Sequence, residues 1–166
     1  MPARAARLAR SNYKTGARVP YAAQVPVLRT LHVFGAIFLL GGVSTHALLR
    51  PMAARATDAA QQALFQFAWR VELALVYTGS ALVLITGVLL WIVGHFKVFT
   101  GWLLLGFLLY AAAAGLDGAF LAPNLRRART TAGEGSQPVA AAAMTVQLVA
   151  WLLLVVVVFL MVAQPF

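Results

Sequence analysis

Long apolar stretches, separated by short polar and basic segments, make up most of this chain. Four of them cover about residues 25–49, 71–95, 99–123 and 140–163. Each contains the roughly 20 apolar residues that a helix needs to cross about 30 Å of hydrocarbon. Apolar residues make up 62% of the sequence and charged residues 10%, which leaves little material for a water-soluble domain. The pattern predicts an all-α fold, a polytopic membrane four-helix bundle.

The charge is strongly positive, with 13 basic and 4 acidic residues and a formal net charge of +9. In a soluble protein this balance could indicate a nucleic-acid partner. Here the basic residues lie in tails and loops beside the apolar stretches, where membrane topology and anionic lipid explain them. We therefore expect membrane lipids as partners and no nucleic acid. The absence of cysteine excludes disulfides, thiolate nucleophiles and c-type haem attachment.

Residues 1–24 carry five basic side chains and show no helical period, so we expect a basic extended arm ahead of the bundle at 25–166. Such an arm gains little by folding on itself. We expect it to contact other membrane protein subunits, together with the fourth helix, which is apolar on all sides. Loops 50–70 and 124–139 carry arginines beside helix ends, which favours the cytoplasmic side of a bacterial inner membrane.

Turn and packing signals divide the chain further. Proline cannot continue a helix comfortably, so we expect helix ends at Arg50-Pro51 and at Pro123-Asn124. Between the first two apolar stretches, residues 59–70 predict a short interfacial helix. Strips of small residues, such as those containing Gly79 in the second stretch and Gly115 in the third, predict close helix packing.

Histidines inside the apolar stretches are candidate haem ligands. His32 and His46 are fourteen residues apart, so they differ by about 40° around one helix and by roughly 21 Å along it. A self-contained diheme core would need four histidines, and the chain has three. The three histidines still allow the chain to bind one b-type haem. Its ligands would be His32 and His95, His32 alone, or His32 together with a residue of a partner protein. The alternative is a histidine that is hydrogen-bonded inside the bundle.

A second group of polar side chains falls at one depth near side B, the side on which the first helix ends (side A is the one on which it begins). The group consists of His46, Arg50, Glu72, Asp117 and Gln147. Because a carboxylate in lipid is costly, we expect Asp117 to be buried and paired with Arg50 or His46. The group could be a proton relay, a quinone-headgroup pocket, a metal site or a structural ion-paired plug. A copper site would need His46 with Met52 and Met144, which lack a characteristic spacing.

Two runs of residues resemble a known family. The run Leu31-His32-Val33-Phe34-Gly35-Ala36, followed by Leu40-Gly41-Gly42, resembles the opening of CopD-like four-helix membrane proteins. The run Leu121-Ala122-Pro123-Asn124-Leu125-Arg126-Arg127 is similar to the family's exit from its third helix. Within that superfamily the chain most resembles the "predicted integral membrane protein" branch, domain of unknown function 2269, over about residues 25–163. The resemblance implies His32 as a possible haem or metal position, and cytoplasmic basic loops.

The sequence contains no nucleophilic triad, phosphate loop or HExxH motif, so we name no catalytic and no metal-ligating residues. Our leading hypothesis is a non-catalytic accessory subunit of a larger membrane complex in electron transport. The alternatives are a b-haem redox protein that uses His32, and a small copper or solute transporter of CopD-like type that uses the polar group near side B.

Overall fold

The computed structural model describes residues 21–94, 101–131 and 141–164, and within these ranges it contains helices and no strand. The arm predicted at 1–24 lies almost wholly outside the described residues, and the first described helix begins at Tyr21. The elements, in chain order, are α2 (Tyr21–Ala53), α3 (Asp58–Val71), η1 (Glu72–Tyr77), α4 (Thr78–Gly94), α5 (Gly101–Leu116), η2 (Asp117–Leu121), α6 (Ala122–Thr131) and α7 (Ala141–Ala163).

Two of the long helices are built from three elements each. α3, η1 and α4 follow one another without a break, and so do α5, η2 and α6. Together with α2 and α7 they are, in the described part of the chain, four helices long and apolar enough to cross a membrane. The prediction of an all-α polytopic membrane protein is confirmed. The residues expected to form a short helix at 59–70 are helical too, as α3, which runs directly into the second span.

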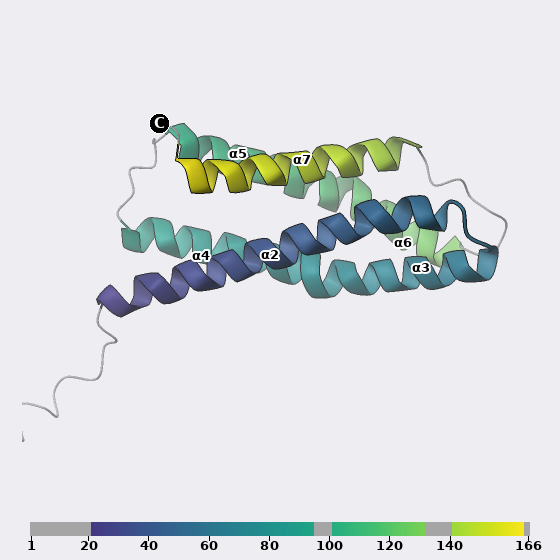
Figure 1. Ribbon diagram of the computed structural model, residues 1–166, viewed down its shortest axis with the longest axis horizontal. Coiled ribbons are helices and arrows are strands. Elements are labelled where there is room, and N and C mark those ends of the chain that lie inside the picture. Colours follow the sequence, from purple (N-terminus) through teal and green to yellow (C-terminus); the bar gives the residue numbers. More distant parts are fainter. Residues whose placement is uncertain (1–20, 95–100, 132–140, 165–166) are drawn as a thin grey trace, which may run out of the picture.

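The helices form two layers, with α2 beside α4 in one and α5 beside α7 in the other (Figure 1). A further contact between α2 and α7 joins the layers. Where the layers meet, the buried core consists of Leu39, Val43, Val76, Ala113 and Leu154. α4 and α5 make no extensive contact with each other in the described residues. The two layers therefore enclose space between them.

The second and third membrane-spanning helices, each built from three elements, are longer than the hydrocarbon core of a bilayer is thick. The span 58–93 has 36 residues and the span 101–131 has 31, which correspond to about 54 Å and 46 Å against about 30 Å of hydrocarbon. Their α3 and α6 ends pack against each other on side B and share a small core with the end of α2. There the Arg129 guanidinium lies 4.8 Å from the centre of the Trp69 ring, a cation–π contact. α3 and α6 thus form a basic helical extension of the bundle on side B.

The prediction that the first helix ends at Arg50-Pro51 is wrong, because α2 continues through Pro51 to Ala53. Proline removes one backbone donor and crowds the carbonyl four residues earlier. Because Pro51 is so close to the end of the helix, the lost hydrogen bond and the crowded carbonyl disturb only its last turn. The last turn still closes, since the Ala54 N–H donates to the Arg50 carbonyl at 3.1 Å.

The third helix does not end at Pro123-Asn124 as predicted, but continues into α6. In a regular α-helix the ring of Pro123 would meet the carbonyl of Ala119. Ala119 lies in η2, a π-helical turn that is wider than an α-turn and moves this carbonyl. The Asn124 side-chain amide also donates to the Phe120 carbonyl at 2.6 Å. The π turn therefore lets the helix pass its proline.

The small-residue strips differ in their role. At Gly79 an added Cβ would lie 2.5 Å from the Leu39 backbone nitrogen and 2.8 Å from the Gly35 carbonyl oxygen, so only glycine allows α2 and α4 to cross here. At Gly115 and Gly118 an added Cβ would meet nothing within 4 Å. The predicted packing strip of the third helix is therefore wrong at these two glycines, whereas that of the second helix marks a true contact.

Candidate functional site

The two acidic residues of the polar cluster (His46, Arg50, Glu72, Asp117 and Gln147) each stand at the start of a π-helical turn. Glu72 begins η1 and Asp117 begins η2. A π turn is hydrogen-bonded over five residues instead of four and is found mostly at functional positions. In η1 the Thr78 hydroxyl donates to the Leu73 carbonyl, five residues earlier, at 3.3 Å. Both turns are rare local structures, and both bring a carboxyl group to the same place.

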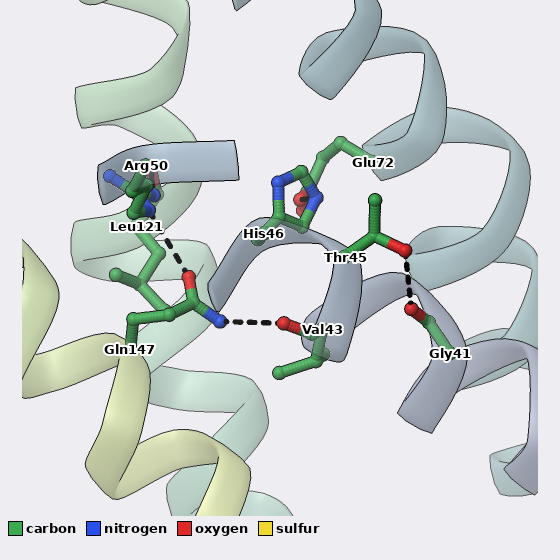
Figure 2. A network of polar contacts seen from close by, with 8 residues as sticks. All are labelled: Gly41, Val43, Thr45, His46, Arg50, Glu72, Leu121 and Gln147. Atoms are coloured by element: carbon green, nitrogen blue, oxygen red, sulfur yellow. Dashed lines mark hydrogen bonds and ion pairs between the residues drawn. The ribbon is translucent and has the colours of Figure 1, made fainter. Parts of the chain in front are cut away.

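His46 and Glu72 face each other in the interior, as Figure 2 shows. His46 Nε2 lies 2.9 Å from Glu72 Oε2, and the two side chains are 4% and 2% exposed. The atoms are at ion-pair distance, but their angles are not those of a hydrogen bond. His46 Nδ1 and Glu72 Oε1 are also buried, and neither has a hydrogen-bond partner among the described residues. Buried polar atoms without partners are uncommon and call for an explanation.

Arg50 links three helices on the other side of His46. Its Nε donates to Gln147 Oε1 at 3.3 Å, and its Nη2 donates to the Leu121 carbonyl at 3.5 Å. The Gln147 amide in turn donates to the Val43 carbonyl at 3.3 Å (Figure 2). Arg50 and Gln147 are both buried. The chain of contacts therefore ties α2 to η2 and to α7 around a buried positive charge.

Asp117 is half-buried, and its electrostatic neighbours are Glu72 and Arg50. It lies within side-chain hydrogen-bonding reach of Glu72. The predicted pairing of Asp117 with Arg50 or His46 is wrong, since no ion pair within 4 Å joins them among the described residues. The reason is that the donors of Arg50 are directed to Gln147 and a backbone carbonyl, while His46 faces Glu72. Asp117 instead faces the other carboxyl group.

A cavity of about 120 Å³ borders Asp117. Its polar lining comes from Asp117, Tyr77, Ser80 and Tyr110, and the rest of its wall is apolar. The Ser80 and Tyr110 hydroxyls lie 2.6 Å apart, and the Tyr110 hydroxyl also donates to the Ser80 carbonyl at 3.0 Å. The size and these polar groups are those of a cavity that can hold several waters.

Toward side A the space between the two layers opens into a cleft of about 520 Å³. Residues of α2, α4, α5 and α7 line it, and almost all of them are apolar. Tyr110, Leu39 and Leu154 belong both to this cleft and to the smaller cavity, so the two spaces are neighbours. A volume of this size lies within the roughly 300–1,000 Å³ of pockets that bind small molecules and cofactors.

His32 lies on the wall of this cleft, and α4 fixes its ring. His32 Nδ1 is 3.0 Å from Thr86 Oγ1, and the Thr86 hydroxyl donates its own proton to the Leu82 carbonyl. With the Thr86 proton directed to the Leu82 carbonyl, Thr86 can accept from Nδ1–H, and in that tautomer the lone pair of the neutral imidazole is on Nε2. The ring packs against Gly87, where an added Cβ would lie 3.2 Å from His32 Cε1. Histidine ligands of metals are held in this manner, by a hydrogen bond from the second ring nitrogen.

The remaining predicted positions are distributed as follows. His95 lies outside the described residues, so a His32–His95 pair stays a prediction. Met52 is 58% exposed and does not belong to the polar cluster. Within the described ranges no three histidine, aspartate or glutamate side chains form a group that could hold a metal ion. The arrangement of these residues therefore gives no support to the copper site predicted from His46, Met52 and Met144.

Sequence reasoning missed the groups that surround His32 and Asp117. Thr86 and Gly87 were not predicted as neighbours of His32, although a hydroxyl beside a glycine in an apolar helix suits a histidine ring. Ser80 and Tyr110 are hydroxyl-bearing residues within otherwise apolar stretches. Their pairing across α4 and α5 could not be read from the spacing within either helix.

Comparison with known proteins shows one relationship. Residues 26–165 match the family described as predicted integral membrane protein (DUF2269). No curated protein and no solved structure matches the chain significantly. Because the match covers most of the sequence, the chain belongs to the DUF2269 family, as its motifs predicted. The wider link to CopD-like proteins stays a prediction.

Proposed function

We propose that this DUF2269 protein binds a flat, hydrophobic redox cofactor, a b-type haem, in the cleft, with Nε2 of His32 as an axial ligand. The observation that carries the proposal is the state of His32. It combines a place on the wall of an apolar cleft with an Nδ1–H that is bound to Thr86. A histidine with only a structural role would not need a place on the wall of an apolar cleft.

The residues present suit such a group. The walls are apolar, and the cleft volume of about 520 Å³ is that of a cofactor site. Met161 of α7 lines the same cleft, and its thioether could help to hold the group. Trp91 offers a ring that can pack on a macrocycle. When bound, a haem would supply one-electron transfer, and the protein would hold it, exclude water and set its axial ligands.

The test is the visible spectrum of the full-length protein, purified and reconstituted with haem. We expect a Soret band that is lost in His32→Ala and kept in His46→Ala, because His46 lies in the polar cluster and not in the cleft. Met161→Leu should keep the haem but change its spectrum, whereas Met144→Leu should not. Equal binding by wild type and His32→Ala, or no binding after reconstitution, would refute the proposal.

A second candidate function is that of an accessory subunit in a larger electron-transport complex. The observation in its favour is that α4 and α5 make no extensive contact with each other in the described residues and carry exposed apolar side chains such as Ile85 and Phe107, on which a helix of another subunit could pack. The basic N-terminal arm would add a contact. Co-purification of stoichiometric partner subunits, with no haem bound to this chain alone, would favour this role. For transport of copper, no metal-holding group supports the proposal in the described residues.

We also propose that side B, with the α3–α6 extension, faces the cytoplasm of a bacterial inner membrane. The support is the gathering of Arg55, Arg70, Arg126 and Arg127 there, beside helix ends. Since the chain has no cysteine, Thr57→Cys in the turn before α3 provides a unique label site. An impermeant maleimide should label it in inside-out vesicles and not in right-side-out ones, and the reverse result would invert the topology.

A further inference from the structure

The polar cluster does not balance its charges without an additional proton. Arg50 contributes one positive charge, and Glu72 and Asp117 contribute two negative charges when both are ionised. Gln147 on α7 carries no charge; Arg70, Arg126 and Arg127 on α3 and α6 are exposed, and Arg129 lies over the Trp69 ring. Tyr77 on η1 is neutral as a phenol. With a neutral His46 the cluster has a net charge of −1, and an unbalanced charge in the interior of a membrane protein is costly.

One proton makes the cluster neutral, and the geometry indicates where it resides. His46 is a poor location, because a second N–H on its ring would place a buried donor at Nδ1, which has no acceptor among the described residues. Glu72 and Asp117 are a better one, since their carboxyl groups lie within hydrogen-bonding reach of each other. A proton between two carboxyl oxygens replaces their repulsion with a short, charge-assisted hydrogen bond.

We propose that Glu72 and Asp117 share one exchangeable proton, so that the polar cluster is a proton-binding site. The unpartnered and buried Glu72 Oε1 is the second, independent indication of a ligand at this place. Binding is a simple protonation: a proton from water joins one carboxylate oxygen, and the net charge of the cluster changes from −1 to 0. Arg50 balances the carboxylate that remains.

The cavity beside Asp117 gives this proton a route. Three of its lining residues, Tyr77, Ser80 and Tyr110, carry hydroxyl groups, and it has space for several waters. Tyr110 also lines the cleft of His32, so its hydroxyl stands between the two spaces. A proton that leaves Asp117 can therefore pass along hydroxyls and water toward the cleft. The proton site itself does not depend on what the cleft binds.

The experiment uses the small number of acids in the chain. Its four acidic residues are Asp58, Glu72, Asp117 and Glu134. The full-length protein, with ¹³C in the side-chain carboxyls of Asp and Glu, is placed in lipid nanodiscs in sodium-free buffer at neutral pH. Infrared and solid-state NMR spectra then report each carboxyl as protonated or ionised. We expect one protonated carboxyl per chain in the wild type, and its loss as the pH is raised.

Single substitutions then locate the proton. Glu72→Gln and Asp117→Asn should each abolish the protonated signal, because Arg50 alone balances the one carboxylate left, whereas Asp58→Asn on the exposed start of α3 should keep it. Full ionisation in the wild type at neutral pH would overturn the proposal without any variant. Loss in only one of the two variants would also overturn it, since the proton would then belong to a single residue. Spectra that follow sodium concentration at constant pH would replace it with a cation site.

Discussion

Replacement of Arg50 by methionine tests whether its charge holds the bundle together. The side chain is 6% exposed and is the positive charge between Glu72 and Asp117. Methionine keeps most of the aliphatic stem and removes the guanidinium, so the change concerns charge and hydrogen bonds more than volume. The substitution also leaves Gln147 Oε1 without its donor.

The size of the effect follows from the geometry. The hydrogen bonds to Gln147 and Leu121, at 3.3 and 3.5 Å, are long, so each contributes no more than about 0.5 kcal/mol. Removal of one partner from buried opposite charges costs about 3–5 kcal/mol. A carboxylate left without a counter-charge can instead take up a proton, which for an ordinary aspartic acid at pH 7 costs about 4 kcal/mol. We therefore expect Arg50→Met to lower the free energy of unfolding by about 3–4 kcal/mol at pH 7.

The assay is reversible unfolding of the helical signal in mixed micelles, with wild type, Arg50→Met, Asp117→Asn and the double variant as a cycle. Asp117→Asn in the Arg50→Met background restores the wild-type charge balance, so it should recover about 2–3 kcal/mol. The deficit of Arg50→Met should also shrink by roughly 2–3 kcal/mol between pH 7 and pH 5, because its folded state binds one proton more and gains stability as the pH falls. A deficit below about 1 kcal/mol, or an additive double variant, would refute the reasoning.

Four further substitutions test the packing. Gly79→Ala places a Cβ 2.5 Å from the Leu39 backbone nitrogen, and thermal unfolding should show a loss of about 1–3 kcal/mol because backbone cannot yield. Gly115→Ala is the matched control, since its Cβ meets nothing within 4 Å; it should gain up to about 1 kcal/mol from helix propensity, and an equal loss at both sites would contradict the crossing. Trp151→Phe removes the 2.9 Å hydrogen bond from Trp151 Nε1 to Ser44 Oγ and should cost about 1 kcal/mol. If Ser44→Ala then adds its full cost in the Trp151→Phe background, the two side chains are not coupled.

The composition of the cluster could be predicted, but not its contacts. A rise of 1.5 Å per residue was sufficient to bring His46, Asp117 and Gln147 to one depth on three helices. The contacts depend on rotation about each helix axis, and the α-helical period predicts this only while a helix remains regular. Glu72 and Asp117 stand at π turns, which shift the rotation of the residues that follow. Asp117, which was expected beside Arg50, lies toward Glu72 instead, because the donors of Arg50 are directed to Gln147 and to the Leu121 carbonyl.

The cleft could not be predicted from the apolar pattern for a related reason. In water, an apolar face must be covered, so periodicity predicts packing. In lipid, α4 and α5 can be apolar on almost every side without packing closely against each other, because lipid or a ligand covers them equally well. His32 could be recognised as a polar group in a span, whereas the space in front of it follows only from the separation of the two layers.

The two π turns also have a consequence for insertions and deletions in this family. Each holds one residue more than an α-helix would use over the same rise. Deletion of one residue from η1 would make the helix regular and leave the facing of α4 relative to α3 nearly unchanged, because the π turn already absorbs the roughly 100° that one α-helical residue adds. Gly79 of α4 must face α2, where the two helices cross, and Phe65 of α3 must face the small core. A homologue that lacks one residue between these two positions can therefore keep both contacts with a regular α-helix, and what it loses is the π turn that begins at Glu72.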